Sequence, residues 1–397
     1  MASVTVQSSL SGEFVTVPFT STLNLALAQQ IAAAISAQVV SGEGVPAFSH
    51  SGEPPRLHDH KSGVFFQDTN GTTWLPRGYD AVVVTANRAT IHGSSDNGES
   101  VLSSNGNLTF VVSGGSGTVV AGGGNNNIQI GDDDETDDRQ GGRDSGSWLV
   151  ATGDGNDTIS ALGSGSDTLR PGSGHNEVAL GSGNDLLQLT GTDTISASCG
   201  HDTIDATGAK STNIDGGAAH LVFLGGGGAA TIDGDSGRDT VYGGSGSLSV
   251  HGGSAGHNLL YAGTGAATLF GGGDGDQLFA QGRQAQALFA GTGNEALSAA
   301  LSSGNDTFFG GYGRATMTGG SGADIFAFVK GSAGGEDLIV NFGGGDKIDF
   351  SGYGRNAVGD ALASQAVSNG SDTITLRDGT KVTFLGITSL KSSDFIH

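Results

Sequence analysis

The sequence predicts an all-β protein whose main part is a parallel β-solenoid of repeats about nine residues long. Two observations support this prediction. Glycine accounts for 73 of the 397 residues, whereas about 7% is usual in globular proteins. Single large apolar residues also recur at a nearly constant spacing from Ile159 to Phe326. Such a spacing is typical of stacked repeats and not of a compact domain with varied elements.

Residues 1–88 are expected to form a small α+β N-terminal domain. Apolar side chains recur every four residues at Leu23, Leu27, Ile31, Ile35 and Val39. This spacing predicts an amphipathic helix, for which Ser21 or Thr22 could be the N-cap. Strand-like apolar runs follow at residues 64–66 and 81–85. The helix has no Lys or Arg, which favours packing against its own domain over binding to a membrane surface.

Residues 89–330 are expected to form the solenoid. A repeat of this length accommodates one short strand and one tight turn, with the apolar residue directed into a thin core and glycines at turn positions. One repeat buries too little apolar surface to fold alone, so the core forms only when repeats stack. The segment 131–147 interrupts the period and includes Asp132, Asp133, Asp134, Glu135, Asp137 and Asp138. Because like charges repel, we expect a solvated loop between coils rather than a dedicated ion site.

A motif of glycine and aspartate recurs in the turns. The best matches are GDGNDTI at 153–159, GSGSDTL at 163–169, GSGNDLL at 181–187, GDGDQL at 273–278, GNDTF at 304–308 and GGSGADIF at 319–326. The series resembles the RTX nonapeptide repeat G-G-x-G-x-D-x-U-x, in which U is a large apolar residue. The resemblance implies a parallel β-roll, in which the Asp two places before U binds Ca²⁺ together with turn carbonyls. Each site is then shared between repeat n and repeat n+2.

The resemblance assigns calcium to eight aspartates, which are Asp157, Asp167, Asp185, Asp193, Asp202, Asp276, Asp306 and Asp324. Asp167, Asp185 and Asp202 fall two repeats apart and are expected to line one edge as consecutive sites. Asp157 and Asp193 are expected to flank Asn176 on the other edge. Asp276 with Glu295, and Asp306 with Asp324, follow the same rule.

The middle repeats depart from the motif. Its aspartate position is occupied by Thr212, Leu221, Ala230, Leu248, Ala267 and Gln286. We expect these coils to stack without calcium; the alternative is that the solenoid changes there into another β architecture. Asp239 is isolated in this stretch and could be only a surface acid.

Residues 331–397 resemble the end of RTX proteins secreted by type I systems, including the serralysin C-terminal domain. The resemblance rests on DLIVNFGGGDKIDFSGYG from Asp337, TITLRDGTKVTFLGI from Thr373 and the final SSDFIH. It implies an uncleaved secretion signal at the C-terminus, which would engage the type I secretion machinery. The segment is also expected to be a β cap that hides the last open strand edge.

Charge and composition exclude several function classes. The chain has 40 acidic and 17 basic residues, a formal net charge of -23, so nucleic acid is not an expected partner. No run of 18 apolar residues predicts a transmembrane segment. The N-terminus lacks the positively charged region of a secretory signal peptide. The single cysteine, Cys199, can form no internal disulfide.

No enzyme motif stands in its proper context. The ten histidines form no HExxH, which argues against a serralysin-like zinc protease. The sequence His58-Asp59-His60 is expected to be an exposed loop. GGSAG at 252–256 and GDSG at 234–237 resemble serine hydrolase motifs, but glycine- and serine-rich repeats produce such matches by chance.

The sequence therefore predicts a secreted, extracellular or cell-surface calcium-binding structural protein, found on the cell surface or in the extracellular matrix. Self-assembly into filaments or a surface layer would make it a homo-oligomer or polymer. The alternative is an adhesin that binds a surface glycan, such as a cell-surface polysaccharide, or a host ligand. An enzyme with an N-terminal active site is the third hypothesis. Because calcium is scarce in the cytosol, we expect the repeats to fold only after export.

Overall fold

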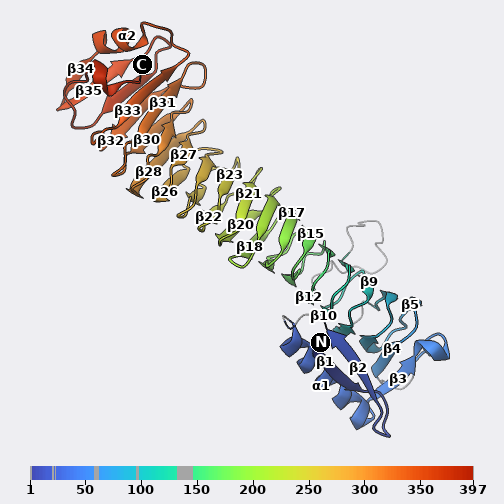
Figure 1. Cartoon of the computed structure of the whole chain (residues 1–397). Helices are drawn as coiled ribbons and strands as arrows, with labels where there is room; N and C mark the ends of the chain where they lie inside the picture. The colour runs from blue at the N-terminus through green and yellow to red at the C-terminus, as the bar shows by residue number, and fades with distance from the viewer. Residues whose placement is uncertain are drawn as a thin grey trace, which may run out of the picture. The chain divides into compact units, whose positions relative to one another are not determined.

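The computed structural model describes residues 2–396 except residues 20, 21, 23, 58–61, 95–97 and 132–145. The chain forms two compact units, Met1–Ser211 and Thr212–His397. Short parallel strands make up most of each unit (Figure 1). No helix of the described residues is long and apolar enough to cross a membrane. The acidic block expected between residues 131 and 147 lies outside the described residues.

The first unit contains two parallel sheets, and from β4 onward each coil contributes one strand to each sheet. Sheet I consists of β3 (Gly44–Phe48), β4 (Ser62–Gln67), β6 (Tyr79–Val84), β8 (Glu99–Ser103), β10 (Gly117–Ala121), β12 (Trp148–Ala151), β14 (Thr168–Arg170), β16 (Leu186–Gln188) and β18 (His201–Ala206). Sheet II consists of β5 (Gly71–Trp74), β7 (Arg88–His92), β9 (Asn107–Val112), β11 (Asn127–Ile130), β13 (Thr158–Ala161), β15 (His175–Leu180) and β17 (Thr192–Ala197).

The second unit has the same two-sheet arrangement. Its sheet I consists of β20 (His220–Gly225), β22 (Thr240–Tyr242), β24 (Leu259–Tyr261), β26 (Gln277–Gly282), β28 (Asn294–Ser302), β30 (Arg314–Thr318) and β32 (Glu336–Val340). Its sheet II consists of β21 (Ala229–Asp233), β23 (Leu248–His251), β25 (Ala267–Phe270), β27 (Gln286–Phe289), β29 (Thr307–Phe309), β31 (Ile325–Val329) and β33 (Lys347–Ser351). In the sequence, β19 (Ser211–Asp215) spans the division between the units.

The core of each unit is a column of apolar side chains between the two sheets. Successive side chains of a strand point to opposite faces, so one central residue of each strand points inward. Val101 lies opposite Val119 in the first unit, and Leu260 lies opposite Leu278 in the second. All four are fully buried. The all-β solenoid predicted from the spacing of apolar residues is confirmed.

A hairpin and a helix cover the outer face of sheet I in the first unit. Strands β1 (Ala2–Gln7) and β2 (Phe14–Phe19) pair antiparallel, and α1 (Leu25–Ser41) follows. They pack against outward side chains of the solenoid, including Phe66, Val83 and Leu102. The residue before the helix is Asn24, whose side chain donates to the Thr152 carbonyl at 2.7 Å instead of capping the helix.

The parallel ladder begins well before the expected boundary at residue 88. Gly44 of β3 already pairs with Ser62 of β4, and β4 pairs with β6. Residues 63–67 are all buried because the helix covers their outer face while the solenoid core covers the inner one. Strands buried on both faces read as continuous apolar runs. The repeat period is therefore hidden in this part of the sequence.

The C-terminal residues cover the end of the second solenoid. After α2 (Ala357–Ala363), strands β34 (Ala366–Ser368), β35 (Ser371–Thr375) and β36 (Lys381–Phe384) pair antiparallel, and β36 pairs parallel with β32. Beyond the short 3-10 helix η2 (Ser392–Asp394), Phe395 bridges to Ile348 of β33. The Ile396 N–H donates to the Ile348 carbonyl at 2.9 Å. The ladder thus ends at β33, beyond the expected boundary at residue 330, and the tail covers its last edge.

Candidate metal centre

In both strands of a coil, a second side chain points into the interior of the solenoid. It belongs to the residue two positions before the large buried apolar residue of that strand. In sheet I of the first unit these residues include Asp167, Asp185 and Asp202. The residues that follow them, at positions 168, 186 and 203, pair in register in adjacent strands. None of the three is more than 4% exposed. The expected alignment of these aspartates along one edge is therefore present.

A hydrogen-bond ladder links the aspartates of this row. The Asp167 N–H donates to Oδ1 of Asp185 at 2.8 Å, and the Asp185 N–H donates to Oδ1 of Asp202 at 3.0 Å. Each carboxylate thus accepts from the backbone of the equivalent residue one coil earlier. This ladder fixes one oxygen of each side chain, and the second oxygen takes no part in it.

The sheet II row of the first unit has the same geometry with mixed chemistry. The Asn126 N–H donates to Oδ1 of Asp157 at 2.7 Å, and the Asp157 N–H donates to Oδ1 of Asn176 at 3.1 Å. The side chain of Asn176 in turn donates to Oδ1 of Asp193 at 2.7 Å. Asp157 and Asp193 flank Asn176, as expected from the sequence.

The second unit contains two rows of the same kind. In sheet II, the Asp306 N–H donates to Oδ1 of Asp324 at 2.8 Å. In sheet I, Asp276 precedes Gln277, which pairs with Ala296, so Asp276 and Glu295 occupy equivalent positions of successive coils. Asp306 and Asp324 therefore lie in adjacent coils of the sheet II row. Asp276 and Glu295 lie in adjacent coils of the sheet I row.

Two further aspartates belong to these rows but were not predicted. The Asp324 N–H donates to Oδ1 of Asp346, and the Ala315 N–H donates to Oδ1 of Asp337, at 2.8 and 2.9 Å. Both bonds join residues 22 positions apart, because the turns are longer here and break the regular spacing. Each aspartate still lies two positions before a buried isoleucine, Ile339 or Ile348, and this signal could have identified them.

Asp239 is not a surface acid, and that interpretation was wrong. Its side chain is 1% exposed. Its N–H donates to Oδ1 of Asn258 at 2.8 Å, and its Oδ2 accepts from the Gly253 N–H at 3.0 Å. Asp239 therefore belongs to the inner row of sheet I, where its neighbours are an amide and an apolar residue instead of acids.

Several inner acids hold one buried oxygen without a hydrogen-bond donor. Among the described residues these atoms are Oδ2 of Asp157, Asp193, Asp202, Asp306 and Asp337, and Oε1 of Glu295. An ionised carboxylate loses hydration when it is buried and must find a donor, a proton or a cation to compensate. Burial accordingly raises the pKa of Asp193 to about 6 and that of Asp202 to about 7.

Other acids of the rows are satisfied by their own turns. Oδ2 of Asp276 accepts the N–H groups of Gly272 and Gly273 at 2.6 and 3.0 Å. Oδ2 of Asp324 accepts the N–H of Gly320 at 2.7 Å. The rows therefore contain two kinds of carboxylate, which differ in whether the backbone already compensates the second oxygen.

The glycine turns bring carbonyl oxygens of successive coils close together. A Cβ on Gly183 would lie 1.7 Å from the Gly165 carbonyl oxygen, and a Cβ on Gly174 would lie 1.8 Å from that of Gly155. Only glycine permits this approach. Carboxylate and carbonyl oxygens of neighbouring coils thus meet at the same edge.

Substitution of one turn glycine tests this packing. A Cβ on Gly246 would lie 1.9 Å from the Gly228 carbonyl oxygen, whereas a Cβ on Gly227 meets only the Ser245 hydroxyl at 3.8 Å. We expect Gly246→Ala to lower the free energy of unfolding by about 1–3 kcal/mol through overpacking. Gly227→Ala is the control and should change it little. Denaturant titration in calcium measures both; equal effects would contradict close packing of the turns.

The middle coils stack without distortion despite their missing acids. In their inner rows, Leu221, Ala230, Leu248 and Ala267 are each at most 9% exposed. The strands around them pair in regular parallel register from β20 to β26 and from β21 to β27. Apolar side chains thus fill the position that an acid occupies elsewhere, and the alternative of a different β architecture does not hold.

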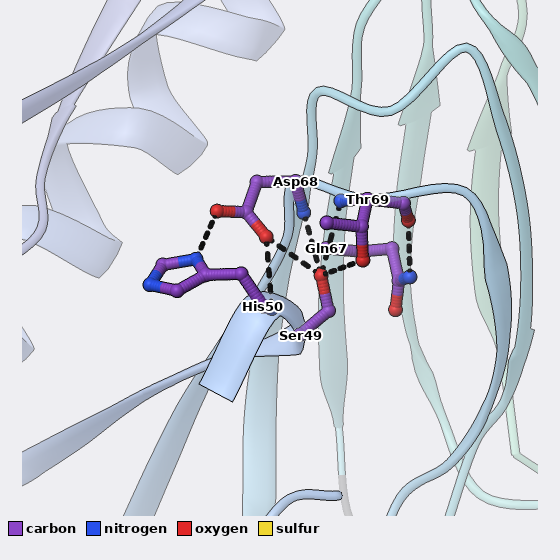
Figure 2. Close-up of polar contacts among 5 residues, drawn as sticks. All are labelled: Ser49, His50, Gln67, Asp68 and Thr69. Carbon is purple, nitrogen blue, oxygen red and sulfur yellow. Dashed lines mark hydrogen bonds and ion pairs between the residues drawn. The ribbon is translucent and has the colours of Figure 1, made fainter. Parts of the chain in front are cut away.

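A cluster of polar residues near the N-terminal end contains Ser, His and Asp but is not arranged as a catalytic triad. Figure 2 shows Ser49 and His50 of the 3-10 helix η1 (Ser49–Ser51) beside Asp68. The Ser49 hydroxyl donates to Oδ1 of Asp68 at 2.7 Å and accepts the N–H groups of Asp68 and Thr69. The His50 imidazole contacts the other carboxylate oxygen. The serine is thus bound to the acid and not to the histidine, an arrangement that holds two turns together.

The remaining candidate enzyme motifs lie in turns of the solenoid or outside the described residues. Ser236 of GDSG donates from its hydroxyl to the Gly217 carbonyl of the preceding coil at 3.1 Å. GGSAG at 252–256 lies between β23 and β24, without the following helix of a nucleophile elbow. His58, Asp59 and His60 are outside the described residues.

Comparison with known families agrees with the repeat motif. Four segments match the RTX calcium-binding nonapeptide repeat, at residues 151–187, 223–247, 252–282 and 302–328. No match was found among curated proteins. The chain therefore contains RTX repeats, and the ion that these repeats bind is calcium. Asp193, Asp202, Asp337 and Asp346 belong to the same rows but lie outside the matched segments.

The residues of the rows fit a calcium ion. Calcium takes six to eight oxygen ligands at about 2.3–2.6 Å. The described residues contain no group of three or more His, Cys, Asp or Glu side chains suited to a metal, so turn carbonyls would have to complete each site. The carboxylates do converge: a Cβ on Gly319 would lie 3.4 Å from Oδ2 of both Asp324 and Asp346. A calcium ion would also compensate the buried oxygens of other acids that have no donor among the described residues.

Proposed function

We propose that the chain is a secreted calcium-binding structural protein of the cell surface or extracellular matrix. In this proposal calcium joins adjacent coils at the eight aspartates of the motif, which are Asp157, Asp167, Asp185, Asp193, Asp202, Asp276, Asp306 and Asp324. The observation that supports it most is the set of buried carboxylate oxygens that have no donor among the described residues. When bound, calcium supplies the positive charge that these oxygens lack.

The arrangement couples calcium to folding. Without the ion, adjacent coils place acids in the same buried row, where loss of hydration and mutual repulsion both oppose stacking. With the ion, the same acids become ligands that link one coil to the next. A chain made in a compartment poor in calcium would thus remain unfolded until it reaches an environment rich in calcium. This property suits export through a type I system, for which the C-terminal residues Asp394, Phe395 and Ile396 are the proposed signal.

Assembly, if it occurs, would use the sides of the solenoid more readily than its C-terminal end. An open strand edge is a template for pairing with another chain. The tail residues Phe395 and Ile396 occupy the edge of β33, so this edge is not available for end-to-end stacking. Filaments or a surface layer would therefore form through the flat faces of the sheets.

Calcium stoichiometry tests the proposed sites. Asp185→Ala removes one carboxylate from the middle of the sheet I row, between Asp167 and Asp202. We expect the variant to bind at least one calcium ion fewer than the natural chain, as measured by equilibrium dialysis with metal analysis. Asp215→Ala is the control, because Asp215 is exposed and its Oδ1 only accepts the Gly217 N–H. Equal stoichiometry in the natural chain and Asp185→Ala would argue against a site at this aspartate.

An adhesin is the second candidate, and a groove of about 390 Å³ in the second unit favours it. Phe289 and Phe309 stack at 4.0 Å on the outside of sheet II, and the next residue in register is the small Ala327. One face of the Phe309 ring therefore borders the groove, beside the exposed Tyr312. Of the residues that the structure describes, none that lines this groove is charged, which suits the apolar face of a neutral sugar. Saturable binding of a soluble glycan to isolated monomers would favour this candidate over the structural one.

A further inference from the structure

Some coils carry an amide where the motif has its aspartate. Among the described residues these are Asn126, Asn176, Asn258 and Gln286. All four side chains are buried, with at most 3% of their surface exposed. A buried amide must satisfy both its oxygen and its NH₂ group, so the partners of the two ends show what each amide does in the row.

The ladder fixes which way each asparagine faces. Oδ1 of Asn176 accepts the Asp157 N–H at 3.1 Å, and Oδ1 of Asn258 accepts the Asp239 N–H at 2.8 Å. Only an acceptor can face a backbone N–H, so a flipped amide would lose this bond and place two donors together. The NH₂ group must therefore point in the opposite direction, toward the next coil. It lies on the side where an aspartate would place its second oxygen.

The NH₂ group contacts the two kinds of oxygen that a calcium ion would bind. Nδ2 of Asn258 donates to the Gly253 carbonyl of its own turn at 2.7 Å and to Oδ1 of Asp276 in the next coil at 3.0 Å. Nδ2 of Asn126 donates to the Gly124 carbonyl at 3.1 Å and to Oδ1 of Asp157 at 2.9 Å. One nitrogen thus bridges a turn carbonyl and the carboxylate of the following coil.

Gln286 binds turn carbonyls next to a coil that has no acid in this row. Its Nε2 donates to three carbonyls, those of Gly263, Gly265 and Gln281, at 3.0, 2.8 and 2.9 Å. Its Oε1 accepts the Gln281 N–H at 2.8 Å. The equivalent residue of the preceding coil is Ala267, which offers no oxygen. The longer side chain reaches the turn carbonyls that converge there.

We propose that these amides take the place of calcium in their coils, so that Asn126, Asn176, Asn258 and Gln286 mark positions that stack without the ion. The inference rests on the proposed calcium sites of the aspartates, and it narrows two of them. Oδ1 of Asp157 already accepts the Asn126 amide and Oδ1 of Asp193 already accepts the Asn176 amide, so an ion at either aspartate would be bound through Oδ2. Each asparagine donates to the carboxylate of the next coil, and Gln286 donates to turn carbonyls alone. None of these amides carries a charge that would repel the next acid. The solenoid thus combines coils that depend on calcium with coils that an amide holds together permanently.

Conversion of an amide to an acid tests the proposal. In Asn176→Asp, the new carboxylate still accepts the Asp157 N–H, but its second oxygen faces Oδ1 of Asp193 in place of the NH₂ group. We expect the variant to bind one more calcium ion than the natural chain and to melt at a lower temperature in chelator. Asn156→Asp is the control: it adds the same charge in the preceding coil, on an exposed side chain whose Oδ1 accepts the His175 N–H. It should leave the stoichiometry unchanged.

The reverse exchange protects the test against a variant that fails to fold. Asp185→Asn keeps an acceptor for the Asp167 N–H and should direct its NH₂ group toward Oδ1 of Asp202. We expect it to bind one calcium ion fewer and to melt at a higher temperature in chelator than the natural chain, whereas Asp185→Ala should gain no such stability. Circular dichroism melts with and without chelator provide this measurement.

The outcomes separate the two proposals. If the natural chain binds calcium but Asn176→Asp binds no more, or Asp185→Asn gains nothing over Asp185→Ala in chelator, the amides do not replace the ion. Loss of a calcium ion in Asn176→Ala would also overturn the inference, because it would show that the asparagine is itself a ligand. If the natural chain binds no calcium at all, the proposed function fails first.

Discussion

Removal of calcium should unfold most of the solenoid at neutral pH. Each site that binds only the folded chain adds about 2.7 kcal/mol of stability when calcium is at 100 times its dissociation constant. Several such sites together approach the whole stability of an ordinary domain, about 5–15 kcal/mol. We therefore expect excess chelator to lower the melting temperature by more than about 10 °C. The far-UV circular dichroism signal of β structure should decrease as well.

Magnesium provides the control for this experiment. It demands a small octahedral site and keeps several of its waters, so it should restore little of the lost structure at the same concentration. Calcium added back in excess should restore all of it. A melting temperature that is the same in chelator and in calcium would contradict the proposal that the ion holds the coils together.

The calcium-free chain should be more stable in mild acid than at neutral pH. Burial raises the pKa of Asp202, Glu295 and Asp337 to about 7 in the folded chain, from ordinary values of 3.8, 4.5 and 3.8. A raised folded pKa means that the folded state binds protons more tightly than the unfolded state. The stability that proton binding by these three acids contributes is therefore complete below about pH 4, and it is lost as the pH rises toward 7.

The measurement is a series of melts in chelator between pH 4.5 and pH 8, values chosen to span this window. The expected result is a melting temperature that falls steadily as the pH rises. In saturating calcium the same range should show the opposite trend, because protons compete with the ion for the carboxylates. A calcium-free chain that becomes more stable toward pH 8 would show that these acids are not buried without partners.

Much of the fold could be predicted because the repeat determines it residue by residue. A large apolar residue every nine positions or so fixes the inward column, as at Leu260 and Leu278, and alternation along the strand then fixes which neighbours face outward. The acid two positions earlier must also face inward, which is why Asp167, Asp185 and Asp202 could be placed in one row from spacing alone.

The structure differs from the sequence-based expectations where long-range packing changes the pattern. Phe66 and Val83 face outward but are buried by α1, so the first coils look like strands of a separate domain. No local signal shows that a helix from residues 25–41 lies over them. Longer turns before Asp337 and Asp346 break the period and hid two members of the rows.

The amide positions show a further limit of sequence reasoning. In the sequence, Asn176 is only a departure from the motif. Its role depends on where the NH₂ group points, and this direction is set by a backbone N–H from the preceding coil. Such information resides in the stacking of coils and not in the composition of any single repeat.

The most direct test of the account is a crystal structure with calcium, in which anomalous scattering locates the ions. We predict ions at the sheet I edge between Asp167 and Asp185 and between Asp185 and Asp202, each bound by carboxylate and turn carbonyl oxygens. No ion should lie between Asn176 and Asp193. Ions found only away from these rows, or an empty row in saturating calcium, would contradict the account.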